Sequence, residues 1–326
     1  MRTPEISVVM SIYNDAKYLP YSIESILCQE GVDFEFIIVN DSAIDESAEI
    51  ATRYAANDQR IRIINQENQG LTKALIKGCH EAQGKFIARQ DADDLSMPTR
   101  LALQAGMLRN NNHLVFVSSW ADVIGPENEL LFTYKRPANP DDATDLLLNG
   151  REHPPGHGSV MFRRDCYERV GGYRPQLYYS QDGDLWLRLG EIGQLGYVQK
   201  VLYQYRITSL SISGARHQIK LPFARLVDEL YAARQAGKSE EPILANAPSV
   251  TDIRNNRESS SEADTQYFIG RALFARRDSR AIKYLRSCLY SNPVNLRAWV
   301  FLLAAFGINV LELFKKMKTF SENGRI

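Results

Sequence analysis

Short apolar runs alternate with amphipathic stretches along the N-terminal part of the chain. Apolar, β-branched runs predict strands, and stretches whose apolar residues recur every three or four positions predict helices. In the first such stretch Leu19, Ile23 and Ile26 fall on one helical face. The strands expected on this basis are residues 6–10, 34–39, 61–64 and 85–88, and the helices are residues 17–29, 45–56 and 71–82.

This alternation predicts an α/β fold, in which a mostly parallel sheet is covered by helices on both faces. Such sheets bind ligands in the crevice beyond the carboxyl ends of their strands. The pattern is mixed after Pro98. There we expect a helix over 98–110, a strand over 114–117, a hairpin or loop over 121–140, a strand over 159–162, a short helix capped by Asp184 and an extended segment over 197–205.

A shift in composition divides the chain. Residues 237–263 are rich in Ser, Glu, Asn and Pro and read as a linker. We therefore expect an α/β domain over 1–236 and a helical extension over 264–326. One part of the extension resembles a single tetratricopeptide-type unit, but stable arrays need several units, so a helical cap is the simpler interpretation.

The overall composition narrows the function classes. The chain has 326 residues and a formal net charge of zero, which argues against a dedicated nucleic-acid binder, so we expect no nucleic-acid partner. Its four cysteines are widely spaced, which predicts neither a disulfide framework nor a zinc site and fits a reducing compartment. We expect neither a secretory signal nor a membrane span, and therefore a cytoplasmic location.

The most informative segment follows the fourth expected strand and contains Asp91, Asp93 and Asp94. Three carboxylates in four residues repel one another unless a cation lies among them. Carboxylate oxygens suit Mg²⁺ or Mn²⁺, and such an ion suits a diphosphate. The alternative is a solvated acidic turn that leads into the next helix, and a lone Asp-x-Asp does little better than that alternative.

Polar side chains also follow the first two expected strands. Asp41 would project over the same crevice, where its carboxylate could accept a hydrogen bond from a base N–H, whereas Asp45 reads as a helix cap. Tyr13 could stack on a nucleobase and Asn14 could shape the turn. A tight strand-to-helix turn with a packed Tyr13 is the alternative.

These motifs together resemble the family 2 glycosyltransferases of the GT-A fold, over about residues 5–215. Each motif is of moderate specificity, but all of them in this order make a strong signal. The segments that carry the resemblance are Ser7–Asn14, Ile38–Ser42, Gln69–Leu71, Ala88–Asp94, His157–Arg164, Val170–Tyr173 and Gln181–Arg188.

The resemblance implies a GT-A fold with a nucleotide-binding half (1–113) and an acceptor-binding half (114–236). It also implies residue roles. Asp41 would contact the base, Asp91 would lie near the ribose or the metal, Asp93 would be the main protein ligand of Mn²⁺ or Mg²⁺, and Asp182 would be the catalytic base of an inverting enzyme. Ser11, Tyr13, Asn14 and Arg89 complete the expected nucleotide site.

Three positions depart from the family pattern. Asn40 replaces a frequent Asp, Ser42-Ala43-Ile44 replaces the usual Gly-Ser-Thr, and Ile76 stands where Asn is common. None of these changes removes the expected metal ligand or base. The departures therefore bear on substrate preference more than on activity.

Two further residues are candidate acceptor contacts. His157 lies in a loop rich in Pro and Gly that could border the site, although a lone loop His is more often structural. Trp186 could form a platform for a sugar, and a packed core Trp is the alternative. Arg89 could equally be a solvated charge.

The function that follows from the resemblance is transfer of a sugar from a nucleotide-diphosphate sugar, by default a UDP-sugar, to an acceptor hydroxyl. The acceptor would be a saccharide or a lipid-linked molecule in surface polysaccharide or glycoconjugate synthesis. A sugar nucleotidyltransferase would need a Gly-rich loop after the first strand, and residues 11–17 contain no glycine. A nucleotide-binding scaffold without turnover is the alternative from another class.

The C-terminal end is basic. Residues 264–326 contain 11 Lys or Arg and 4 Asp or Glu, and residues 311–318 are also amphipathic. A basic amphipathic helix can lie on an anionic membrane surface, which would suit an enzyme with a lipid-linked acceptor. A solvated helix packed on the α/β domain is the alternative.

Overall fold

The computed structural model describes residues 3–150, 152–208, 217–248 and 262–307. The chain forms two compact units. The α/β unit consists of Met1–Asp122, Thr133–Tyr205 and Gln218–Asn256, and the helical unit of Val123–Phe132, Arg206–His217 and Arg257–Ile326.

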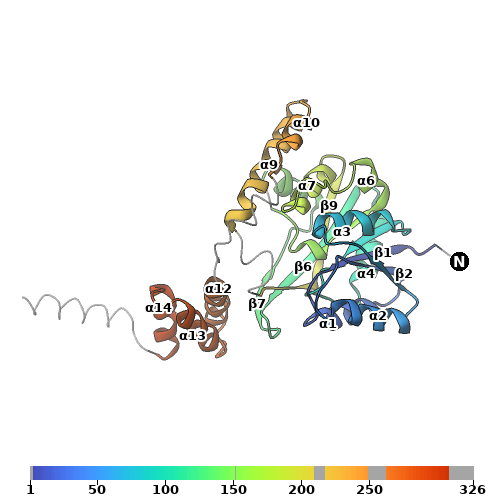
Figure 1. Cartoon of the computed structure of the whole chain (residues 1–326). Helices are drawn as coiled ribbons and strands as arrows, with labels where there is room; N and C mark the ends of the chain where they lie inside the picture. The colour runs from blue at the N-terminus through green and yellow to red at the C-terminus, as the bar shows by residue number, and fades with distance from the viewer. Residues whose placement is uncertain (1–2, 151, 209–216, 249–261, 308–326) are drawn as a thin grey trace, which may run out of the picture. The chain divides into compact units, whose positions relative to one another are not determined.

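A mixed sheet organises the α/β unit (Figure 1). On one side β1 pairs in parallel with both β2 and β4, and β3 pairs in parallel with β2. On the other side β8 pairs antiparallel with β4 and β6, and β5 pairs antiparallel with β9. The strand order is β3-β2-β1-β4-β8-β6-β9-β5, and β7 pairs with β6. The strands are β1 (Ile6–Ile12), β2 (Phe34–Asn40), β3 (Ile61–Asn65), β4 (Phe86–Arg89), β5 (Leu95–Ser96), β6 (Leu114–Ile124), β7 (Leu130–Tyr134), β8 (Met161–Arg163) and β9 (Gln194–Arg206).

The helices lie on both faces of this sheet, because successive side chains of a strand point to opposite faces. Val8 and Met10 of β1 join the core under α1 (Leu19–Leu27), α2 (Ser47–Asn57) and α4 (Arg100–Asn110). Val9 joins the core on the other face. That second core also contains side chains of α3 (Leu71–His80), α5 (Pro140–Leu148), α6 (Arg164–Arg169), α7 (Gln181–Gly190), α9 (His217–Gln235) and α10 (Glu241–Ala245).

Three helices build the described part of the helical unit, namely α12 (Glu262–Ala275), α13 (Ala281–Ser291) and α14 (Leu296–Ala305). A Cβ on Gly270 would lie 2.8 Å from Leu285, so the glycine lets α12 approach α13 closely. Within the same unit, the tip of the β6–β7 hairpin supplies the buried carboxylate of Glu129, which accepts a hydrogen bond from the Tyr284 hydroxyl.

The structure confirms the expected α/β class and most of the expected elements. It also corrects one detail, because α7 begins at Gln181, so Asp184 lies inside the helix and does not cap it. Helices α5, α6 and α9 had no counterpart in the sequence prediction, and α10 lies within the stretch expected to be a linker. None of the described helices has the length and apolar character needed to cross a bilayer.

Candidate active site

The loop after β4 is held by a buried polar network. The Gln90 side-chain oxygen accepts hydrogen bonds from the Ser96 hydroxyl (2.7 Å) and the Arg100 guanidinium (3.0 Å). Arg100 also donates to the carbonyl oxygen of Arg89 (2.6 Å). The Asp94 carboxylate accepts from the Tyr203 hydroxyl (2.7 Å) and is fully buried. Of the three clustered carboxylates, Asp94 therefore stabilises the loop from inside.

Asp91 joins this loop to the segment that contains His157. One carboxylate oxygen accepts from the buried Arg89 guanidinium (2.7 Å), and the other accepts from the backbone N–H of Gly158 (3.0 Å). Both bonds fix the orientation of the carboxylate. The sequence prediction placed Arg89 at the nucleotide, whereas in the structure its guanidinium is buried and contacts Asp91.

Gly158 has no room for a side chain. A Cβ there would overlap the Tyr203 hydroxyl and lie 2.8 Å from the backbone nitrogen of Asp91. We expect Gly158→Ala to lower the free energy of unfolding by about 1–3 kcal/mol, because overpacking must displace one of these groups. Urea unfolding measures this change, and the variant should also lose activity because the Asp91 loop shifts.

Gly106→Ala is the matched control for this substitution. A Cβ on Gly106 meets no atom within 4 Å, and the residue lies inside α4. Alanine in a helix interior is favoured over glycine, so this variant should be more stable by roughly 0.5–1 kcal/mol. Equal stability of the Gly158 variant and the wild type would contradict the packing described here.

Carboxylates gather where the loops after β1, β2 and β4 meet. Burial, with smaller contributions from the negative charges of Asp93, Asp45 and Asp91, raises the pKa of Asp15 to about 7 against a backbone hydrogen bond from Tyr13. Mutual repulsion of this kind favours a bound cation. The donor set is all oxygen and suits Mg²⁺ or Mn²⁺.

No group of three or more His, Cys, Asp or Glu side chains at metal-binding geometry occurs in the described part of the chain. This arrangement is compatible with Mg²⁺, which proteins often bind through one or two carboxylates while substrate phosphates and water supply the other ligands. Asp93 and Asp91 therefore fit a cation shared with a diphosphate and do not form a complete protein cage.

The raised pKa of Asp15 predicts a pH dependence of stability without divalent cations. In the unfolded chain the carboxyl ionises near its ordinary value of 3.8, whereas in the folded chain it keeps its proton to about pH 7. Because the folded state binds the extra proton in this window, stability should fall as the pH rises from about 4 to about 7. Asp15→Asn should remove this slope in urea unfolding with EDTA.

Asp45→Asn is the control, because the pKa of Asp45 is shifted in the opposite direction to that of Asp15. Hydrogen bonds from Ser47 and Ala16 lower the pKa of Asp45 against the effect of burial, so its ionised form stabilises the fold above its unfolded pKa. That variant should lose stability at pH 5, and less at pH 8, where removing the Asp45 charge also relieves repulsion of the ionised Asp15. A wild-type slope that persists in Asp15→Asn would contradict the assignment to Asp15.

Hydrogen bonds join the loop after β1 to the loop after β2. The side-chain oxygen of Asn14 accepts from the backbone N–H of Ile44 (2.9 Å), and Asn14 and Ser42 both have positive φ. Tyr13 is 46% exposed, so its ring is not packed in the core. This exposure favours the stacking interpretation of Tyr13 over the packed alternative. Ser11 lies near the end of β1, beside Val39 of β2.

Asp41 is buried and organises the loop before α3. Its carboxylate accepts hydrogen bonds from the Gln66 side chain (2.7 Å) and from the backbone N–H groups of Gln69 (2.9 Å) and Gly70 (2.8 Å). These bonds support the rim of the expected nucleotide site. The predicted contact of Asp41 with a base would have to be made in addition to them.

His157 lies at the centre of the second half of the site. Burial, with a smaller contribution from the positive charge of Arg89, lowers the pKa of His157 to about 4, and the carboxylates of Asp182 and Asp91 act in the opposite direction. The imidazole is thus neutral at pH 7, and its Nε2 lies 2.6 Å from the Tyr173 hydroxyl. The structure therefore brings Asp182, Asp91 and Arg89 around one histidine.

Asp182 occupies the first turn of α7. The residue before this helix, Ser180, has a left-handed backbone (φ 58°), which is uncommon for a residue with a side chain. One Asp182 carboxylate oxygen accepts from the backbone N–H of Gly183 (2.9 Å). Asp184 is buried and bonded to Arg188 (2.6 Å), so only Asp182 of the two is suited to take up a proton.

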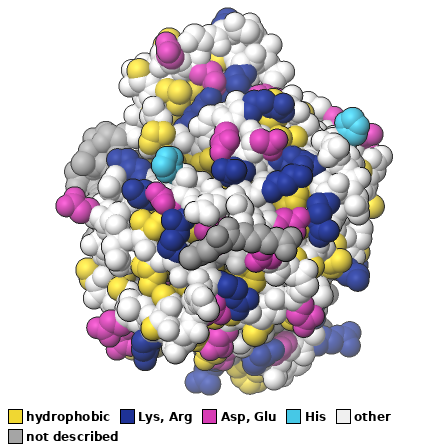
Figure 2. Space-filling view, turned by 90° about the vertical axis from the view of Figure 1, so that its right-hand side faces the viewer, with side chains coloured by type: hydrophobic (Ala, Val, Ile, Leu, Met, Phe, Trp, Pro, Cys, Tyr) yellow, Lys and Arg dark blue, Asp and Glu magenta, His cyan; other side chains and the backbone are white. Residues whose placement is uncertain are grey.

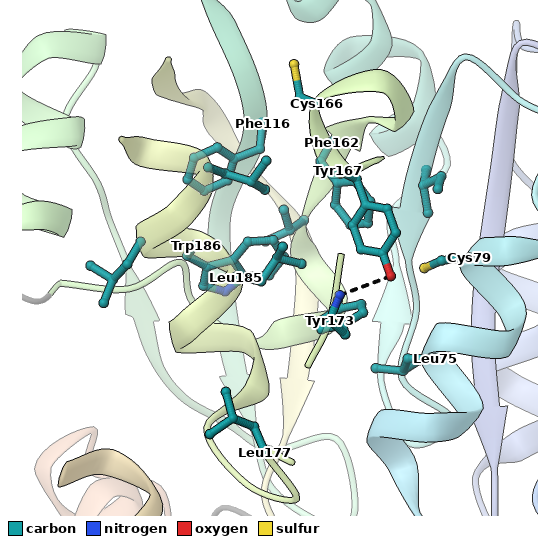
Figure 3. Close-up of a cluster of buried hydrophobic side chains, with 14 of the residues drawn as sticks. Leu75, Cys79, Phe116, Phe162, Cys166, Tyr167, Tyr173, Leu177, Leu185 and Trp186 are labelled. Atoms are coloured by element: carbon teal, nitrogen blue, oxygen red, sulfur yellow. Dashed lines mark hydrogen bonds between the residues drawn. The ribbon is translucent and has the colours of Figure 1, made fainter. Parts of the chain in front are cut away.

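Trp186 packs in the core behind this turn. Its side chain is 1% exposed and stacks on Phe116, with ring centroids 5.5 Å apart (Figure 3). It also meets His157 edge to face at 5.8 Å. These contacts favour the core interpretation over a sugar platform, and they fix the position of the imidazole.

Sequence reasoning missed several residues that shape the site. Tyr203 and Arg100 order the loop after β4, and Tyr173 bonds to His157. His153 lies against the first turn of α7, since a Cβ on Gly183 would meet its ring at 3.0 Å. Tyr173 lies in a segment that carries the family resemblance, but no role was expected for it. Tyr203 and Arg100 lie in no such segment, and the sequence gives no local signal for their contacts because distant segments create them.

Comparison with known proteins identifies the family. The sequence model described as glycosyl transferase family 2 matches residues 7–171. A putative glycosyltransferase, EpsE, of Bacillus subtilis is 36% identical over 211 residues, which cover 62% of this chain and 73% of EpsE. This chain belongs to glycosyl transferase family 2. An uncharacterized glycosyltransferase of Methanocaldococcus jannaschii, MJ1057, is 35% identical over 211 residues, which cover 64% of this chain and 72% of MJ1057.

Solved structures of GT-A enzymes share the fold of this family member. S. aureus TarS 1–349 in complex with UDP-GlcNAc aligns with a TM-score of 0.56 at 14% identity, over 91% of this chain and 89% of TarS 1–349. The mannosyltransferase PcManGT from Pyrobaculum calidifontis, in complex with GDP-Man and Mn²⁺, aligns with a TM-score of 0.52 at 17% identity, over 96% and 88% of the two chains. At these identities the likeness establishes the GT-A fold, as the sequence resemblance implied.

Proposed function

We propose that this glycosyltransferase moves a sugar from a nucleotide-diphosphate sugar, a UDP-sugar by default, to an acceptor hydroxyl with inversion. One observation carries the proposal. The Asp91 carboxylate accepts a hydrogen bond from the backbone N–H of Gly158, next to His157 (3.0 Å). The charges of Asp91 and Asp93 raise the pKa of Asp15, and those of Asp91 and Asp182 oppose the lowering of the pKa of His157. A continuous set of carboxylates thus runs from the expected nucleotide end of the site to the expected acceptor end.

The proposed roles follow from this order. Tyr13, with Ser11 and Asn14 in the same loop, would border the base, and Asp41 would contact it or hold the loop beside it. Arg89 would hold Asp91 toward the ribose and the metal. A divalent cation at Asp93 and Asp91 would neutralise the charge that develops on the leaving diphosphate.

Asp182 would act as the general base. Its carboxylate would accept the proton of the acceptor hydroxyl as the oxygen attacks the anomeric carbon. With one base and no enzyme nucleophile, direct displacement inverts that carbon. His157 is neutral and bonded to Tyr173, so it would bind the acceptor through hydrogen bonds and would not take the proton.

The donor and acceptor remain part of the proposal. The fold neighbours bind UDP-GlcNAc or GDP-Man, which supports a nucleotide-diphosphate sugar as the donor.

We propose a saccharide or lipid-linked acceptor, a cytoplasmic location and peripheral membrane contact through the basic helical end. We also propose that residues 1–236 are the catalytic domain and 264–326 an extension. Within the linker expected over 237–263, α10 packs on the core of the α/β unit. Lys, Arg, Asp and Glu are interspersed over the face in Figure 2, which shows no large basic area there.

A donor screen tests the proposed activity. The full chain would be incubated with UDP-, GDP- and dTDP-sugars plus Mn²⁺ or Mg²⁺, and release of the nucleoside diphosphate would be measured. We expect release from at least one donor, loss of release with EDTA and recovery on adding the cation back. Tight nucleotide binding with no turnover of any donor, with and without saccharide acceptors, would favour the scaffold alternative.

A further inference from the structure

Large apolar side chains are exposed at one end of the helical unit. They lie at the end of α13, in the following turn and along α14, within the short span 290–306. We call these residues the apolar patch, with exposed fractions of 92% for Tyr290, 82% for Val294, 73% for Leu296, 43% for Trp299 and 61% for Phe306. A concentration of exposed apolar surface of this kind marks an interaction site.

The apolar patch spans two helices, with Tyr290 at the end of α13 and three members along α14 and at its end. Leu296, Trp299 and Phe306 recur at helical spacing, so they lie along one side of α14. The Trp299 indole N–H donates to the carbonyl oxygen of Pro293 (2.9 Å), which holds the ring against the turn that carries Val294. The core of the helical unit uses a different side of α14, because Ala298 and Leu302 are the residues buried there.

The charged residues nearest the apolar patch in the sequence are basic. No Asp or Glu occurs between Asp278 and Glu312, whereas that interval contains four Lys or Arg, of which Arg280 pairs with Asp278 and Lys283 with Glu127. Arg286 is exposed one turn before Tyr290, on the same side of α13. Arg297 is exposed too, but it does not share the side of α14 that carries Trp299.

We propose that the apolar patch docks onto an anionic phospholipid bilayer, with Trp299, Tyr290 and Phe306 in the interface and Arg286 at the head groups. Tryptophan and tyrosine favour the membrane–water interface because their rings are amphipathic. Each Lys or Arg near an anionic surface adds attraction. This inference rests on the membrane contact included in the proposed function, and it names the residues and the lipid surface that would make that contact.

The charge near the apolar patch also makes a second copy of this chain a poor partner for it. A symmetric dimer interface joins the same patch on both copies. It would bring the arginines of the two copies together, and the interval that forms the patch has no acidic residue to oppose them. An anionic lipid surface satisfies the apolar area and the positive charge at once.

Vesicle co-sedimentation of the full chain tests the proposal. The vesicles would be phosphatidylcholine alone, or phosphatidylcholine with about 30 mol% phosphatidylglycerol, which supplies a negative surface potential. We expect binding to the anionic vesicles only, weakened by salt. Trp299→Ser/Phe306→Ser should lower the partition coefficient at least about tenfold, because binding scales with buried apolar area. Arg286→Gln should lower it about fivefold.

Matched variants keep the test decisive. Tyr21→Ser removes an aromatic ring that is 61% exposed on α1, outside the apolar patch, and should bind vesicles like the wild type. Leu296→Gln gives a second patch variant if the double variant fails to fold by circular dichroism. Full binding by folded patch variants would overturn the proposal. So would equal, negligible sedimentation of the wild type with both vesicles, or a wild-type dimer that patch variants dissociate without vesicle binding.

The proposed activity is tested separately in vesicle-free solution. Donor hydrolysis there should be the same in the wild type and the patch variants. Vesicle binding without donor turnover would reject the proposed activity and leave the docking surface intact. Donor turnover without vesicle binding would do the reverse.

Discussion

Asp182→Asn should lower the rate constant for sugar transfer by about 100- to 10,000-fold, because the amide cannot accept the acceptor proton. The variant should fold normally, since the hydrogen bond from the Gly183 N–H reaches an oxygen that asparagine retains. Donor affinity should change little, because the diphosphate is expected at the other end of the carboxylate set. Single-turnover transfer assays at saturating donor measure the effect.

Asp184→Asn is the contrasting control two residues along the same helix. Asp184 is fully buried and paired with Arg188 and Arg174. Breaking a buried pair costs about 3–5 kcal/mol of stability. This variant should therefore lose activity together with folding. Full transfer by Asp182→Asn, or an equal loss of stability in both variants, would refute the distinction between base and buried ion pair.

Asp93→Ala should lower donor turnover by about 100- to 1,000-fold at a fixed low Mn²⁺ concentration. The physical reason is the loss of electrostatic stabilisation of the leaving diphosphate. Unlike the Asp182 variant, it should lose both donor hydrolysis and transfer. Turnover measured as a function of Mn²⁺ concentration, with matched titrations of Mn²⁺ into the protein with UDP, gives the result.

Asp94→Asn is the control for this prediction, because Asp94 is a neighbouring carboxylate that bonds inward to Tyr203 (2.7 Å). Asparagine can still accept that hydrogen bond. The Mn²⁺ dependence of turnover should thus match the wild type, with at most a change in stability. If Asp94→Asn shifts the Mn²⁺ dependence as strongly as Asp93→Ala does, then the assignment of ligands within the loop is wrong.

The parallel half of the sheet could be predicted from the sequence because its strands are rich in apolar, β-branched residues. β1, β2 and β3 begin and end within a few residues of their expected bounds. Since the carboxyl ends of parallel strands lie at one edge of a sheet, the topology alone predicted that the acidic side chains after these strands lie close together. Their joint effect on the pKa of Asp15 agrees with that expectation.

Other features depend on tertiary contacts that leave no local pattern. Strand β8 was expected over 159–162 and lies at Met161–Arg163, but its antiparallel pairing with β4 and β6 could not be read from the sequence. Helix α7 begins earlier than its apolar period indicates, because Ser180 takes a left-handed conformation just before Gln181. The inward bonds of Asp94 and Tyr203 could not be predicted either, since they join segments more than a hundred residues apart.

A crystal structure with UDP and Mn²⁺ tests the central claim, that these carboxylates converge on one donor site. The account predicts that an Asp93 oxygen lies at about 2.0–2.3 Å from the cation, that the diphosphate shares the ion, and that the Asp182 carboxylate faces the same cavity. Mn²⁺ and UDP bound away from the loop after β4, or an ion with no contact to Asp93, would contradict it.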